Sequence, residues 1–265
     1  MLTNTLVLFL RDLLPMFIMF AYLKAIYRPH FDGSLRIWVT VLCGCSIGLV
    51  VLFYYENLSD YFEGTGIEWL KIVLVSISFI GFLLSQIFSL ATLWNYFLSV
   101  AVVCLLSVHF SSFLLYFAVY FAYDIVVFEL LIGCLIGVGI CVSFYFLYSF
   151  FVEELWDSKL YPVILLLWSL FVANQLSLMT NYLHQIDVVD FGTRRFVDLS
   201  DWVKEGSEYG FILKALSGFD ASPSVFYSLV VAIAFVTMFF LALLNRSHLR
   251  QHKKSLEARP MEQTQ

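Results

Sequence analysis

The sequence predicts an all-α, polytopic membrane protein with seven transmembrane helices. Its 265 residues are 61% hydrophobic and only 13% charged, whereas a soluble globular chain is about half apolar and a quarter charged. The apolar residues form continuous runs rather than the alternating pattern of a membrane β-barrel. The net charge of −5 gives no reason to expect a nucleic-acid partner. These observations exclude a water-soluble enzyme, a nucleic-acid-binding protein and a disordered chain.

The spans follow from the rule that a helix crosses a bilayer with about 20 apolar residues. Between Lys71 and Asp124 there are 52 residues without Asp, Glu, Lys or Arg, so this stretch must contain two crossings. The polar tripeptide 94–96 (Trp-Asn-Tyr) is the predicted joint between them. The same rule places the seven spans at 5–26, 36–55, 70–92, 97–121, 127–150, 161–181 and 224–244.

Basic residues predict the orientation of these spans. Lys24, Arg28 and Arg36 lie around the first loop, and the tail 246–265 carries five further Lys and Arg residues. Short loops rich in Lys and Arg stay in the cytoplasm. We therefore expect an integral protein of a cytoplasmic (inner or plasma) membrane with its N-terminus outside and its C-terminus inside. The first apolar run lacks a basic leader, so we expect it to be retained as a span.

Glycines suggest an internal repeat. Gly44 and Gly48 in span two form a G-x-x-x-G pair, and Gly133 and Gly137 form another 89 residues later. Such pairs let helix backbones approach closely, so independent packing motifs are one interpretation. The other is a duplicated three-helix unit, which inverts in the membrane because it has an odd number of spans. The predicted organisation is a first repeat at 1–92, a second at 97–181, an extracytoplasmic segment at 182–223, the seventh helix at 224–245 and a cytoplasmic tail at 246–265.

Polar residues inside the spans are the first candidates for function. A charged group in mid-span costs about 2.5–3.5 kcal/mol on insertion scales, yet span one contains Arg11 and Asp12, followed by Pro15. Proline frees a carbonyl one turn upstream. Neighbouring helix positions do not face each other, so the two charges need not pair. Asp12 could bind a cation and Arg11 could neutralise another acid. The alternative is a structural ion pair, or shallow groups that reach the outer surface.

Two further spans contain polar candidates. Span four contains His109, and span six contains Asn174 and Gln175. Each is either a hydrogen-bonded packing residue or part of a polar path. A haem bound by His109 and His184 is disfavoured, because the two residues lie at different predicted depths. The polar residues that we expect to support a site in the spans are Arg11, Ser111, Ser112, Asn174 and Gln175.

Acidic residues gather in the second loop. They form either a solvated loop or a mouth that raises the local cation concentration. No nucleotide-binding, zinc-binding or nucleophile motif is present, so we expect neither an enzyme nor a bound cofactor. The residues of this predicted outer acidic mouth are Glu56, Asp60, Glu63 and Glu68.

Four segments resemble the oxidase-dependent iron permeases, a family of fungal high-affinity iron permeases and their bacterial relatives. They are YFEGTGIEWLK at 61–71, GCLIG at 133–137, YLHQID at 182–187 and LSDWVKEGSEYGFILKALSGFDASPS at 199–224. The resemblance implies seven spans, an inverted three-plus-three repeat and an external N-terminus. It also implies iron or another divalent metal as the cargo.

The resemblance also implies which residues bind the metal. The family carries an R-E-G-x-E motif in spans one and four; here these positions read RDLLP at 11–15 and HFSSF at 109–113. One carboxylate of four remains. The implied metal ligands are Asp12 and His109, facing each other across the pseudo-two-fold axis. A carboxylate and an imidazole suit a divalent ion such as ferrous iron better than ferric iron.

The sequence therefore predicts a divergent metal-ion permease. The alternative is a non-transporting permease-fold subunit or scaffold of a membrane complex, since most of the expected carboxylates are missing. The partners expected are membrane lipid and either an extracytoplasmic metal-handling or oxidase protein, as the resemblance implies, or other membrane subunits.

Overall fold

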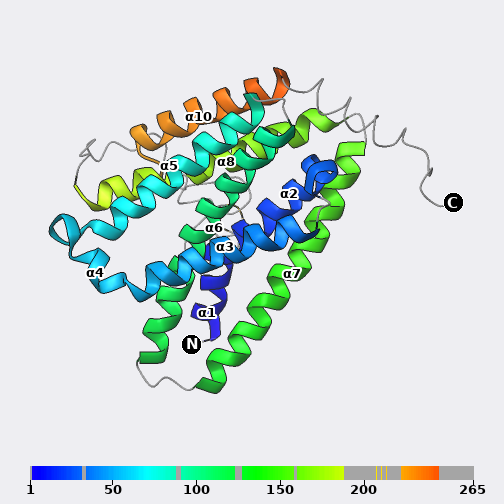
Figure 1. Ribbon diagram of the computed structural model, residues 1–265. Coiled ribbons are helices and arrows are strands. Elements are labelled where there is room, and N and C mark those ends of the chain that lie inside the picture. The colour runs from blue at the N-terminus through cyan, green and yellow to red at the C-terminus, as the bar shows by residue number, and fades with distance from the viewer. Residues whose placement is uncertain are drawn as a thin grey trace.

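The chain folds into a bundle of helices (Figure 1). The computed structural model describes residues 2–31, 34–87, 91–122, 127–157, 160–187 and 222–244, with Ser207, Gly210 and Leu213. These residues contain no β-strand, so the predicted all-α class is confirmed. The helices are α1 (Leu2–Leu8), the π-helical turn η1 (Phe9–Leu13), α2 (Leu14–Phe31), α3 (Ser34–Phe53), α4 (Tyr55–Ser59), the 3-10 turn η2 (Tyr61–Gly64), α5 (Gly66–Ile87), α6 (Ala91–Ala122), α7 (Val127–Asp157), α8 (Tyr161–Gln185) and α10 (Val225–Leu244).

Seven of these helical stretches are long and apolar enough to cross a membrane, as predicted. Span one consists of α1, η1 and α2 together, and spans two to seven are α3, α5, α6, α7, α8 and α10. The predicted joint at 94–96 is wrong, because α6 already begins at Ala91. Trp94 is buried and Tyr96 is exposed. Both residues lie in the first turns of α6 and do not interrupt the helix. Aromatic residues of this kind are common where a span meets the membrane interface.

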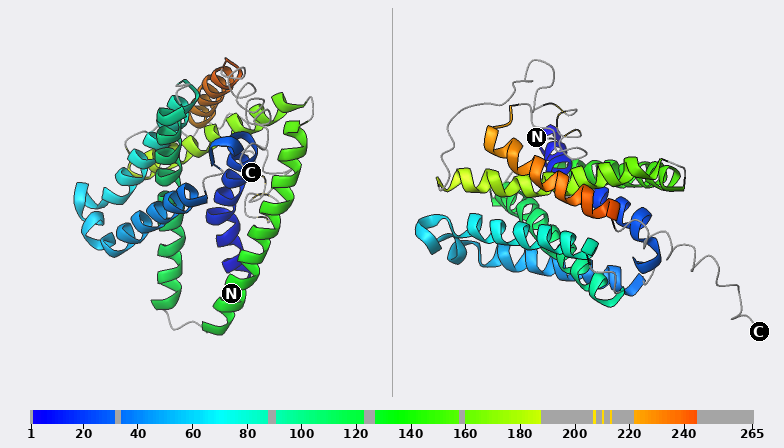
Figure 2. Two further views of the ribbon diagram at one scale, coloured as in Figure 1. Left: turned by 45° about the vertical axis from the view of Figure 1, so that its right-hand side comes forward. Right: turned by 90° about the horizontal axis from the view of Figure 1, so that it is seen from above.

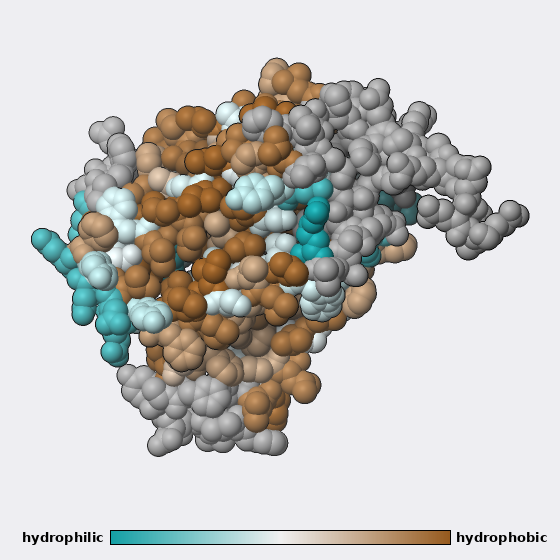
Figure 3. Space-filling model, viewed as in Figure 1, coloured by the Kyte–Doolittle hydropathy of each residue, from teal (hydrophilic) through white to brown (hydrophobic). Residues whose placement is uncertain are grey.

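The spans divide into a buried centre and an exposed rim. Most of spans one, four and six is buried inside the bundle, whereas spans two, five and seven are mostly exposed. Figure 2 shows α3, α7 and α10 on different sides of the bundle. The face in Figure 3 is largely apolar over the spans, with hydrophilic residues at its left end and a second hydrophilic group on the right, beside the grey residues. An apolar outer face and a buried centre are what a bundle in lipid requires.

Each glycine pair packs on the first span of the other half of the chain. Gly44 and Gly48 on α3 contact Leu106 and Phe110 of α6. The pair on α7, Gly133 and Gly137, contacts Thr5 and Phe9 of span one. The close approach expected of G-x-x-x-G pairs is therefore confirmed. This reciprocal packing, α3 on span four and α7 on span one, is also the pattern expected of an inverted repeat. The repeat itself stays a prediction.

Gly137 and Gly139 offer a matched test of this packing on one helix. A Cβ added at Gly137 would lie 2.5 Å from the ring of Phe9, whereas one added at Gly139 would meet no atom within 4 Å. We expect Gly137→Ala to lower the free energy of unfolding by about 1–3 kcal/mol through overpacking. Gly139→Ala should raise it by up to about 1 kcal/mol, because alanine is the better helix former. Denaturant unfolding in detergent measures both, and equal effects would contradict the proposed close contact.

Several predicted regions lie outside the described residues. They include the tail 246–265 and nearly all of the segment after 187, apart from Ser207, Gly210, Leu213 and the residues from 222 onward. The segment expected to begin at 182 starts later, because α8 continues to Gln185. The orientation of the termini and the identity of the membrane stay predictions. The two ends of the bundle are therefore named by structure: the α4 end, where α4 lies, and the opposite end.

Candidate functional site: a polar cavity in the bundle

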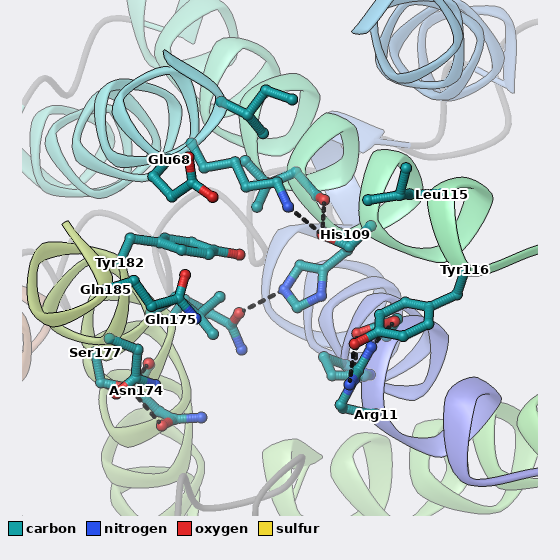
Figure 4. A pocket seen from close by; sticks show the side chains of 18 of the residues that line it. Arg11, Glu68, His109, Leu115, Tyr116, Asn174, Gln175, Ser177, Tyr182 and Gln185 are labelled. Atoms are coloured by element: carbon teal, nitrogen blue, oxygen red, sulfur yellow. Dashed lines mark hydrogen bonds and ion pairs between the residues drawn. The ribbon is translucent and has the colours of Figure 1, made fainter. Parts of the chain in front are cut away.

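A cavity of about 440 Å³ lies between span one, α5, α6 and α8 in the half of the bundle toward the α4 end. We call it the polar cavity. Its wall runs from exposed Asn181 and Gln185, at the end of α8, to His109 and Gln175, which are about 95% buried. Figure 4 shows His109 in the middle of the cavity, between Arg11 and Tyr116 on one side and Glu68 and Tyr182 on the other. The site therefore extends from one end of the bundle into its core.

The backbone of span one widens where its charged residues lie. Residues Phe9–Leu13 form a π-helical turn, in which the N–H of Leu14 bonds the carbonyl of Phe9. Pro15 follows directly and has no N–H to continue the ordinary ladder. Single π-helical turns of this kind are frequent at functional sites. The carbonyl that the sequence predicted to be freed by Pro15 lies in this turn.

Arg11 and Asp12 pair with each other. Arg11 Nε and Nη2 donate to Asp12 Oδ1 and Oδ2 at 3.0 and 2.9 Å. Such a two-bonded pair is among the stronger charge interactions in proteins. The interpretation of these residues as an ion pair is therefore correct, and each carboxylate oxygen accepts one hydrogen bond from Arg11.

The guanidinium of Arg11 is also held by Tyr116 on α6. Arg11 Nη1 donates to the Tyr116 hydroxyl at 3.2 Å, and Arg11 Cζ lies 4.4 Å from the centre of its ring. Tyr116, one of 15 tyrosines in the chain, was not predicted from the sequence. The only sequence signal for Tyr116 is its position seven residues after His109, which places both residues on the same face of a helix.

His109 is hydrogen-bonded to span six and shares its cavity with span one. Its Nε2 lies 2.9 Å from Gln175 Oε1. Asp12 of span one lines the same cavity. The structure therefore brings together Asp12 and His109, the two residues implied as metal ligands, and adds Gln175, one of the predicted supporting residues.

Lys71 is a cavity residue that the sequence analysis did not select. Its Nζ donates to Ser112 Oγ at 3.0 Å and lies 5.4 Å from the centre of the Tyr182 ring. We expected span three to begin at 70, so Lys71 was assigned to its very start; α5 begins at Gly66 instead. A Cβ at Gly66 would clash with the carbonyl oxygen of Leu58. This close turn sets the start of α5 and so places Lys71 more than one turn inside it.

The other predicted supporting residues have separate roles. Ser112 lines the cavity, whereas Ser111 does not and instead donates to the carbonyl of Val108. Asn174 lines the cavity and accepts hydrogen bonds from Ser177 and, at 3.4 Å, from Tyr227 of α10. Asn174 therefore also links spans six and seven, as expected of an amide that joins helices.

The predicted acidic mouth is mostly separate from the cavity. Glu56, Asp60 and Glu63 are exposed on the turn formed by α4 and η2 and do not line the cavity. Glu68 alone of the four lines it. The backbone of this turn is left-handed at Glu63 (φ 59°) and Gly64 (φ 95°), just before α5 begins.

The described residues do not assemble a preformed metal centre. No group of three or more His, Cys, Asp or Glu side chains within the described part of the chain is placed to hold a metal ion. His184 is exposed at the end of α8 and does not line the cavity that contains His109. The disfavoured haem site would need these two histidines to meet, and the structure does not bring them into one cavity.

Four aromatic rings fill the core beyond the cavity. Tyr22, Phe82, Trp168 and Phe171, which we call the aromatic layer, are all at most 1% exposed. The ring of Trp168 lies 5.3–5.8 Å, centre to centre, from the other three. Trp168 is seven residues from Gln175 on α8, which is about 10 Å along a helix. The layer therefore closes the core between the cavity and the opposite end.

No family model, curated protein or solved structure matches the chain. The resemblance to the iron permeases consequently rests on the sequence segments alone, and function must be argued from the cavity.

Proposed function

We propose that the chain is a membrane permease that binds a small polar solute in the polar cavity and moves it between spans one, three, four and six. The observation that carries this proposal is the burial of Asp12, His109 and Gln175 at the inner end of a cavity that reaches the surface. Charged and polar groups inside a membrane bundle are expensive and typically mark solute or ion pathways. A purely structural bundle gains nothing from a cavity lined by such groups.

The aromatic layer supports the same proposal. It leaves the cavity accessible from the α4 end and closes the core on the other side. In each of its two states, an alternating-access permease is open on one side of its site and closed on the other. The closed side changes from one state to the other. The distribution of Lys and Arg assigns the α4 end to the outside, so the described state is the outward-facing one under this proposal.

The exchanged glycine contacts suggest how the two halves move. We infer that the repeats 1–92 and 97–181 are inverted copies, since each glycine pair holds the first span of the other copy. Rocking of such halves around a central site is a common route to alternating access. The contacts of α3 with α6 and of α7 with span one would then act as the two moving interfaces.

A metal cation is the second candidate for the cargo. It is favoured by the shared position of Asp12 and His109 in one cavity, with the amide oxygen of Gln175 beside the imidazole. Carboxylate, imidazole and amide ligands suit a divalent ion. Such an ion would compete with Arg11 for the carboxylate of Asp12, which accepts two charge-assisted hydrogen bonds from Arg11.

Labelling of a cysteine in the cavity tests the permease without knowledge of the solute. Ser112→Cys, in a background with the five native cysteines replaced by serine or alanine, places a thiol in the cavity wall. A permease exposes this thiol to both sides of the membrane in turn. We expect a membrane-impermeant maleimide to label it in right-side-out and in inside-out vesicles.

Ser107→Cys is the matched control, because Ser107 lies on the same helix but is fully buried outside the cavity. It should stay unlabelled from either side. Labelling of Ser112→Cys from one side only would contradict alternating access. That result would favour the non-transporting subunit instead.

A further inference from the structure

Lys71 is a cation of the polar cavity without a matched carboxylate. The described residues form two ion pairs, Arg11 with Asp12 and Lys24 with Glu153, and Lys71 belongs to neither. Glu68 lines the cavity one turn earlier on the same helix but lies beyond ion-pair distance of Lys71. A charge held inside a membrane bundle is normally paired. We therefore expect Lys71 to be able to bind a negative group.

The two protein contacts of Lys71 are neutral and leave donors available. An ammonium group has three N–H donors, and its one hydrogen bond to a described side chain goes to Ser112 Oγ at 3.0 Å. The second contact is the Tyr182 ring, whose centre lies 5.4 Å from Nζ. The face of the ring attracts the cation electrostatically and does not accept a conventional hydrogen bond. The ammonium is therefore positioned by its neighbours but not saturated by them.

The rest of the cavity adds hydrogen-bonding groups and the carboxylate of Glu68, which is not within ion-pair distance of Lys71. Asp12 is neutralised by both of its bonds to Arg11. The amide side chains of Gln175 and Asn181 line the cavity at its inner and outer ends, and amides both donate and accept hydrogen bonds. Near Lys71 the cavity thus combines this cation, the carboxylate of Glu68 and polar groups that suit hydroxyl, amino or carbonyl substituents.

We propose that the polar cavity binds a small organic carboxylate, with the carboxylate group on Lys71 and Ser112 and the rest of the molecule against the amides. The volume of about 440 Å³ lies within the range typical of small-molecule sites. The inference rests on the proposed function, because the carboxylate is the class of solute that this permease carries. The carboxylate of the solute would give Lys71 the ion pair that no described side chain forms with it.

Thermal unfolding of the purified protein in detergent tests the inference. The probes are the sodium salts of acetate, lactate, pyruvate, succinate, malate and citrate at constant pH and ionic strength, with sodium chloride and lactamide as controls. A ligand that binds only the folded state raises its melting temperature in a saturable way. We expect at least one carboxylate to do so, and neither chloride nor lactamide.

Variants of Lys71 connect the effect to this side chain. Lys71→Met keeps the length of the side chain and removes its charge, so it should weaken carboxylate binding about tenfold or more, which equals about 1.4 kcal/mol. Lys71→Arg should restore most of the affinity. Lys24→Met is the matched control, because Lys24 lies toward the opposite end of span one and pairs with Glu153 at 3.0 Å; it should bind carboxylate as the native protein does.

Two results would overturn the inference: no carboxylate raises the melting temperature, or Lys71→Met binds as tightly as the native protein. These failures are distinct from failure of the permease. Cavity labelling from both sides without carboxylate binding removes this solute class and keeps the permease. Carboxylate binding with labelling from one side only keeps the site and removes transport.

Discussion

Replacement of Trp168 with alanine is expected to lower the free energy of unfolding by about 3–5 kcal/mol, the usual cost of truncating a buried tryptophan. Trp168 is 0% exposed and lies within 6 Å, centre to centre, of the rings of Tyr22, Phe82 and Phe171. The three rings come from three different spans, so the cavity left by the indole cannot close by the movement of one helix. Denaturant unfolding in detergent measures the change.

Trp38→Ala is the matched control, since Trp38 on α3 is 66% exposed. A substitution at such an exposed position usually changes stability by no more than about 0.5 kcal/mol. Equal losses in the two variants would show that the aromatic layer is not the tightly packed centre of the bundle.

The same variant also tests whether the aromatic layer is a barrier. In Trp168→Ala, the thiol of Ser112→Cys should react faster with an impermeant maleimide supplied from the opposite end. The reason is that the indole lies between that end and the inner wall of the cavity. An unchanged rate from that end would contradict the assignment of the layer as the closed side.

Removal of the ion pair between Arg11 and Asp12 is expected to have the second largest effect on the free energy of unfolding. Asp12→Asn should lower the free energy of unfolding by about 1.5–3 kcal/mol, because it removes hydrogen bonds between charged groups. The loss should stay below the 3–5 kcal/mol of a fully buried pair, since the Arg11 side chain is 39% exposed. Denaturant unfolding of Arg11→Gln, Asp12→Asn and the double variant gives the coupling energy, which we expect to exceed about 1 kcal/mol.

The pair of Lys24 and Glu153 provides the comparison within the same chain. Its side chains are 45% and 28% exposed, and exposed pairs typically contribute about 0.2–1 kcal/mol. The cycle of Lys24→Gln and Glu153→Gln should therefore give the smaller coupling. Additive effects of the Arg11 and Asp12 variants would contradict the paired geometry.

The Asp12 variant also decides between the two candidate cargoes. If Asp12 is a metal ligand, ferrous or ferric iron should raise the melting temperature of the native protein and not that of Asp12→Asn. If Asp12 stays paired with Arg11, neither ion should change the melting temperature of the native protein or of Asp12→Asn. Uptake of labelled iron into proteoliposomes containing the native protein provides the corresponding transport measurement.

The sequence by itself determined the helical class and the number of spans. Apolar runs of about 20 residues can satisfy their backbone in lipid only as helices, so composition and run length are sufficient. The charged residues in span one were also found from sequence, because an intramembrane Arg or Asp stands out in any apolar run. The same argument selected His109, Asn174 and Gln175, all of which line the cavity.

The tertiary structure decided which of these residues meet and with which partners. Lys71, Tyr116 and Tyr182 were missed because each lies near a predicted span end, where lysine and tyrosine are common, and only the packing of α5, α6 and α8 turns them into one cavity. The sequence also left open whether Arg11 and Asp12 pair. The π-helical turn at Phe9–Leu13 changes the local geometry from that of a regular helix, and the two bonds between these side chains follow from contacts that helical periodicity does not encode.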